Sequence, residues 1–250
     1  MELDPVTISF LTLIALFAGF VDSIAGGGGI VTLPALMAVG IPPHQALATN
    51  KLQSSFGSLT ATLNYSRLGM MNIRDLLLGV VTTLIGALAG SIAVQRFRAD
   101  SLQHLILLML VVIFVYTLFS PRLGVEPTAG RVGDIPLYSG AGLAIGFYDG
   151  FFGPGTGSFW TMALVLGLGL DLKSATAQTK LFNFISNIVS LCVFIHAGLV
   201  LWMVGIAMGA GQMAGAYIGS TMVHRRDVRF VRIFFLIVVS ATIFKLIFFG

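Results

Sequence analysis

The chain has 250 residues, of which 56% are hydrophobic and only 10% are charged, whereas an ordinary soluble domain has roughly 25% charged residues. This composition, with a mean hydropathy of +0.96, excludes a soluble globular domain and predicts a membrane protein. The net charge of +4 does not indicate a nucleic-acid partner. The basic residues lie mostly in short connections between apolar segments, where they set membrane topology.

Read in chain order, the sequence predicts an all-α polytopic membrane protein with about eight transmembrane helices, because apolar stretches near or above ~20 residues recur throughout. The segments are expected at about 7–40, 44–66, 73–95, 101–119, 137–170, 174–197, 200–223 and 229–248. The first and fifth are too long for one plain span, and a glycine cluster interrupts each. No removable signal peptide is expected, since Glu2 and Asp4 stand where a basic region would be.

The two halves of the chain match each other in sequence. "GFVDSIAGGGG" from residue 19 matches "GFYDGFFGPGT" from residue 146, and "ALATNKL" from residue 46 matches "ATAQTKL" from residue 175. The offset is 127 residues for the first pair and 129 for the second, and such self-similarity at a nearly constant offset indicates an internal repeat. We therefore expect a first four-helix repeat over 1–119, a polar linker over 120–136 and a second four-helix repeat over 137–250.

Loop charge predicts how these repeats are oriented. Arg96 and Arg98 follow the third segment, and the equivalent loop after the seventh segment reads "HRRDVRFVR". Because Lys and Arg accumulate in cytoplasmic loops, both loops are expected on the cytoplasmic side. Equivalent loops on one side require an even number of crossings per half. The sequence therefore predicts eight crossings, a parallel repeat, and both termini outside the cell.

The glycine clusters at 26–29 and 153–157 are expected to break their helices. Glycine costs about 1 kcal/mol and proline about 3 kcal/mol in a helix interior. Unpaired backbone at membrane depth survives only where protein or a wet cavity surrounds it. A break exposes N–H groups at the positive end of the second half-helix. Paired broken helices at matching positions thus favour an anion-binding site of a transporter.

Two other interpretations of the glycines are weaker. Small residues also allow close helix packing, which is the better interpretation of Gly86 and Gly90 and of the series Gly211, Gly215 and Gly219. A nucleotide-binding loop is disfavoured, because "GPGTGS" lacks the lysine that follows the glycines of a Walker A loop.

Two lysines, Lys51 and Lys180, occupy matching positions inside apolar segments. Ionisable groups at such depth usually face a cavity or a partner, although a lysine near a segment end can also extend to the interface. Asp22 and Asp149 are the matching acids, which could cap a half-helix, pair with a lysine or couple transport to protons or another ion. Polar side chains around the lysines are Thr49, Asn50, Gln53, Ser54, Gln178, Thr179, Asn183 and Asn187.

No catalytic or metal-binding constellation stands out, so we predict neither an enzyme nor a cofactor. The four histidines are dispersed near segment ends, without metal-ligand spacing. Cys192 is the single cysteine, which excludes an internal disulfide and disfavours a thiolate metal site.

With both glycine clusters and both lysine motifs in place, the sequence resembles the sulfite exporter TauE/SafE family of four-plus-four helix permeases over about residues 8–248. The resemblance implies a multi-pass protein of the plasma (inner) membrane of a bacterium or archaeon. It also implies secondary transport of small sulfur-containing or organic anions, such as sulfite or sulfoacetate. Pro154 and Thr156 stand in the second cluster where the first has only glycine, so the two half-sites are not assumed to be equivalent.

We therefore predict a secondary transporter, acting as an exporter, that works by alternating access at a site between the repeats. Its partners are the lipid bilayer, the small anion and a coupling proton or ion. The alternatives are a passive anion channel and an intramembrane enzyme. The predicted substrate-binding residues are Gly26, Gly27, Gly28, Gly29, Asn50, Lys51, Gln53, Gly153, Gly155, Thr156, Gly157, Thr179, Lys180 and Asn183.

Overall fold

The computed structural model describes residues 4–119 and 130–225, and within these ranges it contains helices and no strand. This confirms the all-α class. The helices are α1 (Pro5–Ala25), α2 (Gly28–Ala38), α3 (Pro43–Arg67), the 3₁₀ turn η1 (Ile73–Leu76), α4 (Leu77–Val94), α5 (Ala99–Phe119), α6 (Asp134–Phe151), α7 (Thr156–Leu168), α8 (Leu172–His196) and α9 (Trp202–Arg225). The segment expected at 229–248 and most of the linker lie outside the described residues.

Both glycine clusters break the chain between two helices, as the sequence predicts. Between α1 and α2, Gly26 and Gly27 have φ values of +71° and +147°. Between α6 and α7, Gly153 and Gly155 have φ values of +98° and +83°. Side chains with a Cβ atom rarely adopt these values, so glycine is what allows the chain to leave the helix and turn at these points.

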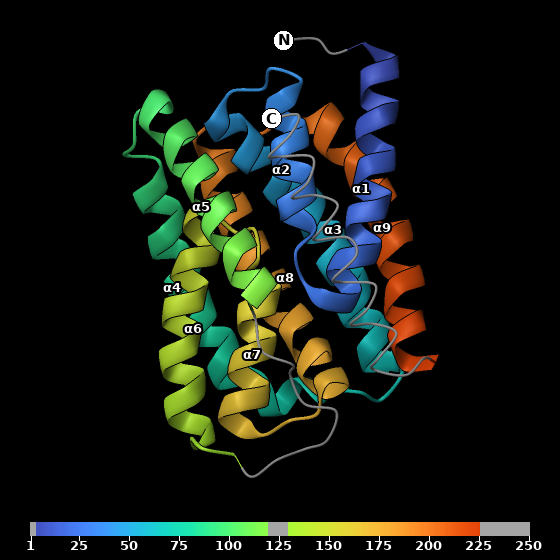
Figure 1. Cartoon of the computed structure of the whole chain (residues 1–250), viewed down its shortest axis with the longest axis vertical. Helices are drawn as coiled ribbons and strands as arrows, with labels where there is room; N and C mark the ends of the chain where they lie inside the picture. The colour runs from blue at the N-terminus through green and yellow to red at the C-terminus, as the bar shows by residue number, and fades with distance from the viewer. Residues whose placement is uncertain (1–3, 120–129, 226–250) are drawn as a thin grey trace.

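Each broken segment is a hairpin that turns back toward the face from which it came (Figure 1). Near the end of α2, Leu36 belongs to the same buried cluster as Leu11 from the first half of α1. Near the end of α7, Leu164 belongs to the same buried cluster as Tyr138 at the start of α6. The α1–α2 and α6–α7 segments therefore do not cross the molecule from one face to the other.

Helix α1 runs in the same direction as α9. Gly211 of α9 lies against Thr12 of α1, and Gly219 two turns later lies against Phe20. Helix α3 also runs along α9 in this direction. A Cβ atom on Gly205, near the start of α9, would meet Leu52, whereas Asn64 near the end of α3 donates a hydrogen bond to Ser220.

Helix α6 runs in the same direction as α4. Gly79 at the start of α4 lies against Tyr138, and Gly90 near its end lies against Phe147. Because α4 returns from the end of α3 after η1, α4 and α6 run opposite to α1, α3 and α9 (Figure 1). The matching helices α1 and α6 are thus antiparallel.

The predicted parallel repeat with eight crossings is therefore wrong. That prediction assumed that each broken segment crosses the membrane. Each one instead turns back, so the second repeat begins in the opposite direction to the first. The loop after Val94, which holds Arg96 and Arg98, and the basic end of α9 at Arg225 lie at opposite ends of the molecule. Loop charge therefore does not place both termini outside the cell.

Glycines join α1 to α9 and α4 to α6 at backbone distance. A Cβ atom on Gly215 would lie 1.9 Å from the carbonyl oxygen of Leu16, and one on Gly90 would lie 2.0 Å from that of Phe147. This confirms the packing interpretation of these glycines. Each tight pair combines one helix from residues 1–119 with one from the second half of the chain.

Three helices in the described part of the chain are long and apolar enough to cross a membrane by length and composition: Pro5–Ala25, Ile73–Val94 and Leu172–His196. The 25-residue helix α3 is too polar to qualify. Its polar side chains are buried by neighbouring helices, mainly α8 and α9, so they face protein and not lipid. Polar residues in this position mark an internal site.

Candidate functional site

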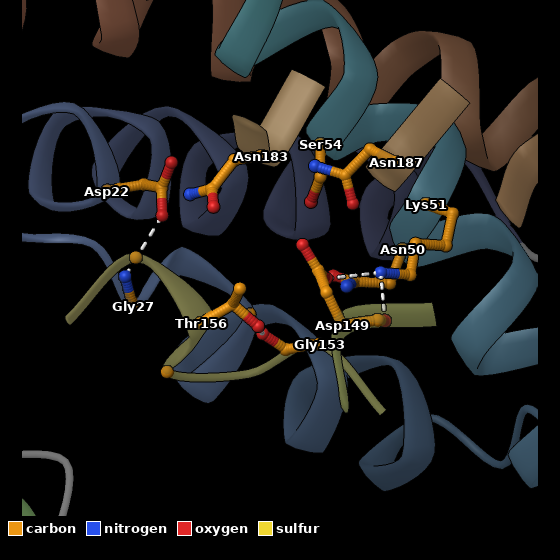
Figure 2. Close-up of a pocket in the computed structure, with 13 residues that line it drawn as sticks. Asp22, Gly27, Asn50, Lys51, Ser54, Asp149, Gly153, Thr156, Asn183 and Asn187 are labelled. Atoms are coloured by element: carbon orange, nitrogen blue, oxygen red, sulfur yellow. Dashed lines mark hydrogen bonds and ion pairs between the residues drawn. The ribbon is translucent and has the colours of Figure 1, made fainter. Parts of the chain in front are cut away.

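A polar cavity lies where the two helix breaks meet (Figure 2). The breaks touch each other, since a Cβ atom on Gly26 would lie 2.5 Å from the Cα atom of Gly157. The cavity is small, since the centres of water molecules can occupy about 30 Å³ of it. Its lining is Asp22, Gly27, Gly29, Asn50, Lys51, Ser54, Asp149, Gly153, Gly155, Thr156, Gly157, Asn183 and Asn187. All of these residues are glycine, polar or charged, so the cavity suits a small hydrophilic ligand.

One end of the cavity is formed by an ion pair between Lys51 of α3 and Asp149 of α6. The Lys51 ammonium lies 2.6 Å from Asp149 Oδ1 and also donates to the Asp149 carbonyl oxygen at 2.5 Å. The Ser186 hydroxyl of α8 donates to the other carboxylate oxygen, Oδ2. The side chains of Lys51 and Asp149 are 1% and 4% exposed. This pair is buried, and both carboxylate oxygens of Asp149 accept a hydrogen bond.

At the other end, Asp22 of α1 pairs with Lys180 of α8. The Lys180 ammonium lies 3.1 Å from Asp22 Oδ2. The backbone N–H groups of Gly27 and Gly28 donate to Asp22 Oδ1 at 2.9 and 3.1 Å. Asp22 therefore caps the N-terminus of α2, where the helix dipole favours negative charge. Its side chain remains 20% exposed, which makes this pair the more open of the two.

The two pairs are reciprocal, because each acid pairs with the lysine of the opposite half of the chain. Neither lysine extends to the membrane interface, since both are almost completely buried. Two ammonium groups and two carboxylates leave the four charges balanced. The lysines thus neutralise carboxylates first, and the remaining positive potential comes from the helix N-terminus that no carboxylate caps.

The N-terminus of α7 has open donors. Thr156 N donates to Gly153 O and Ser158 N donates to Gly155 O. Among the hydrogen bonds of the described residues, none uses the N–H groups of Gly155 or Gly157, and both glycines line the cavity. Two unpaired N–H groups at a helix N-terminus form a cradle for an oxyanion.

Side-chain amides surround the cavity. The Asn50 carboxamide oxygen accepts from Thr32 Oγ1 at 2.6 Å and from Gln53 Nε2 at 2.8 Å, so Gln53 and Thr32 position Asn50. Asn183 is 6% exposed, and its carboxamide oxygen has no hydrogen-bond partner in the part of the chain that the structure describes. A buried polar atom left unpaired beside a cavity is costly, which points to a ligand or water there.

The structure brings most of the predicted site residues to the cavity. Those that line it are Gly27, Gly29, Asn50, Lys51, Gly153, Gly155, Thr156, Gly157 and Asn183. Those behind the lining are Gly26, Gly28, Gln53, Thr179 and Lys180. Two residues of the second group hold residues of the lining: Lys180 holds Asp22 and Gln53 holds Asn50. Thr179 shares a hydrogen bond with Thr161, which does not line the cavity.

Four residues of this region were not assigned to the predicted site. Ser54 and Asn187 line the cavity, and each lies one helical turn after a predicted residue, so the helical period could have identified them. Ser186 lies in α8 next to Asn187, and its hydroxyl donates a hydrogen bond to Asp149 of α6. Gln212, which is 1% exposed, packs against both Gly19 and Gly28, and its only sequence signal is a single amide in a glycine-rich helix.

The cavity offers N–H donors, side-chain amides and two ion pairs around a polar space. Within residues 4–119 and 130–225 no group of three or more His, Cys, Asp or Glu residues could hold a metal ion.

Comparisons with known proteins agree with a transport role. The family profile described as Sulfite exporter TauE/SafE matches residues 11–246. A relative from Escherichia coli K12, named "Probable membrane transporter protein YfcA", is 41% identical over 245 residues, which cover 98% of this chain and 91% of the relative. A "Probable membrane transporter protein ORF9" from Sinorhizobium sp is 40% identical over 240 residues, covering 96% of this chain and 92% of that protein.

A third relative, a "Probable membrane transporter protein" from Haemophilus influenzae, is 37% identical over 232 residues, covering 93% of this chain and 91% of the relative. No solved structure matches the chain. The family match over nearly the whole length, together with the apolar helices around a buried polar cavity, shows that the chain belongs to the TauE/SafE sulfite exporter family of membrane transporters.

Proposed function

We propose that the protein is a secondary transporter that carries small anions across the plasma (inner) membrane by alternating access. The observation that carries this proposal is the polar cavity between two broken helices, lined by the unpaired N–H groups of Gly155 and Gly157. Broken helices that meet inside the membrane form the substrate site in several transporter folds. Membership of a transporter family supports the same conclusion.

The proposed substrates are small sulfur-containing or organic anions, such as sulfite or sulfoacetate, moved in the export direction. The family description, Sulfite exporter TauE/SafE, supports this class. The lining supports it independently, because glycine N–H groups and amides bind oxyanions and none of the described residues that line the cavity has an apolar side chain to bind a larger hydrophobic group.

The packing suggests which parts move in the proposed cycle. Helices α1, α3 and α9 form one group and α4, α6 and α8 form the other, with α3 against α8 between them. Each group thus contains a helix from both halves of the chain. Both ion pairs connect the two groups, since Lys51 of α3 holds Asp149 of α6 and Asp22 of α1 holds Lys180 of α8. The two groups are related as inverted repeats. We expect one group to move against the other during transport, and we no longer expect residues 1–119 to move against residues 137–250.

Anion flux in proteoliposomes tests this function. Lys51→Met together with Lys180→Met leaves two unbalanced carboxylates near the cavity and should abolish sulfite flux. Lys173→Met, a lysine near the start of α8 that does not line the cavity, is the matched control and should retain flux. Thermal unfolding confirms that the compared proteins are folded. Unchanged flux in the double variant would contradict the proposed site.

A milder pair of variants tests the cavity without disturbing the ion pairs. Thr156→Val and Asn183→Leu keep the side-chain size and should raise the KM for sulfite, because both side chains line the cavity. An unchanged KM in both would show that the substrate binds elsewhere.

Transport driven by an ion gradient separates this proposal from the two alternatives. A secondary transporter accumulates the anion against its own gradient when a proton or other ion gradient is imposed. A passive channel only equilibrates it. An intramembrane enzyme would instead form a new product from the anion in detergent solution.

A further inference from the structure

We propose that the two helix breaks have different roles, and this inference rests on the proposed function. The N-terminus of α7 binds the oxyanion of the substrate. The N-terminus of α2 already holds an anion of the chain itself, the carboxylate of Asp22. Asp22 thereby makes the cavity prefer singly charged substrates over doubly charged ones.

The α2 break is filled by the protein. The two leading N–H groups of this break, from Gly27 and Gly28, both donate to the same oxygen of Asp22, and Lys180 holds the other oxygen. A carboxylate with these three donors occupies the position that an oxyanion would take at a helix N-terminus. A substrate at this position would have to displace it.

The α7 break is not filled in the same way, and Pro154 accounts for one of the two missing donors, while Gly155, which matches Gly28, keeps its N–H group. In the matched motifs, Pro154 stands where the first break has Gly27. Proline has no backbone N–H, so the bond from Gly27 to Asp22 has no counterpart from Pro154 to Asp149. Asp149 instead accepts from Lys51 and Ser186. The N–H groups of Gly155 and Gly157 stay unpaired among the residues that the structure describes.

A buried amide beside the open N-terminus of α7 has an unfilled hydrogen-bond position. Asn183 is 6% exposed, lines the cavity, and has no hydrogen-bond partner for its carboxamide oxygen in the described ranges. This oxygen is an acceptor, so it fits a hydrogen-bond donor, such as the protonated oxygen of bisulfite, and not an oxygen of a dianion. Its Nδ2 atom lies 3.1 Å from where a Cβ atom on Gly157 would be, so the amide sits beside the open N-terminus. Figure 2 shows Asn183 between Asp22 and Asp149, facing Thr156 across the cavity.

The preference for singly charged substrates follows from the balance of charges around the cavity. Lys51 and Lys180 are balanced by Asp22 and Asp149, so a bound monoanion gives the site one net negative charge and a dianion gives it two. Buried net charge is costly. Asp22 also lines the cavity and repels a second negative charge on the ligand. Within the proposed class, monosulfonates and bisulfite should therefore bind better than dianions.

Binding of two sulfonates to the purified protein tests this inference. Methanesulfonate carries one negative charge and sulfoacetate carries two. The wild type should bind methanesulfonate more tightly. Asp22→Asn removes one negative charge and weakens the cap on α2, so it should raise the affinity for sulfoacetate relative to methanesulfonate by about tenfold. An unchanged ratio would overturn the inference.

Two further variants keep the test decisive. If Asp22→Asn alone does not fold, Asp22→Asn with Lys180→Met removes the whole pair and still frees the N–H groups of α2, so the ratio should again shift toward sulfoacetate. Asp171→Asn, outside the cavity, is the control and should leave the ratio unchanged. If the wild type binds neither sulfonate and moves no sulfite, the proposed function fails. If it binds both but Asp22 does not affect the ratio, only this inference fails.

Discussion

Asp22 and Asp149 occupy matching places in the sequence but have different surroundings in the structure. Asp149 is buried and hydrogen-bonded to Lys51 and Ser186, with its side chain 4% exposed. Asp22 caps α2 through two backbone N–H groups and remains 20% exposed. The repeat therefore supplies the same pair of charges twice, and the local backbone decides how each acid is used. Pro154 removes one of the two N–H donors that could hold Asp149 as Asp22 is held.

Breaking the ion pair between Lys51 and Asp149 should have the largest effect on stability. Lys51→Met leaves the Asp149 carboxylate buried without its cation, which we expect to cost about 3–5 kcal/mol. Lys180→Met should cost less, because Asp22 keeps two N–H donors and is partly exposed. Thermal unfolding in detergent measures both. Equal losses, or a larger loss for Lys180→Met, would contradict the difference between the two pairs.

The matched control for this comparison removes both partners. In Lys51→Met with Asp149→Asn no unpaired charge is left, so much of the lost stability should return. A double variant as unstable as the single one would show that Lys51 contributes through packing and not through its charge.

The next largest loss of stability should come from substituting the glycines through which helices pack closely. Gly90→Ala in α4 and Gly215→Ala in α9 place a Cβ atom within 2.0 Å of a facing carbonyl oxygen, and such overpacking costs about 1–3 kcal/mol. Gly140→Ala in α6 is the control, because nothing lies within 4 Å of its Cβ position. It should be neutral or slightly stabilising. Comparable losses in all three variants would exclude close packing as the cause.

The smallest loss of stability should come from removing the side-chain cap at the start of α8. Asp171 caps α8, whereas α3 begins after Pro42 without a side-chain cap. Partial burial acts to raise the pKa of the Asp171 carboxyl, but hydrogen bonds from Ser174 and from the N–H group of Lys173 outweigh it and hold the pKa below its usual value. Asp171→Ala should cost about 1 kcal/mol.

This last effect has a defined pH dependence. A carboxyl with a lowered pKa in the folded state stabilises the protein above the pKa of the unfolded chain, and the stabilisation is lost as the pH falls through the folded pKa. The difference in Tm between wild type and Asp171→Ala should therefore be full at neutral pH and disappear in acid. A difference that grows in acid would contradict the cap.

The sequence predicted the parts of the site better than their arrangement. The helix breaks follow from glycine and proline chemistry, and the burial of Lys51 and Lys180 follows from their depth in apolar segments. The direction of the second repeat could not be predicted, because loop charge does not reveal whether a broken segment crosses or turns back. That direction determines which acid each lysine meets, so the reciprocal pairing of Asp22 with Lys180 also required the structure.

The most direct test is an experimental structure with a selenium oxyanion, such as selenite, whose anomalous scattering locates it without ambiguity. We predict selenium in the cavity, with an oxygen atom within hydrogen-bond distance of the N–H groups of Gly155 and Gly157, while the Asp22 carboxylate still caps α2. An empty cavity with selenium bound elsewhere in the protein would contradict it.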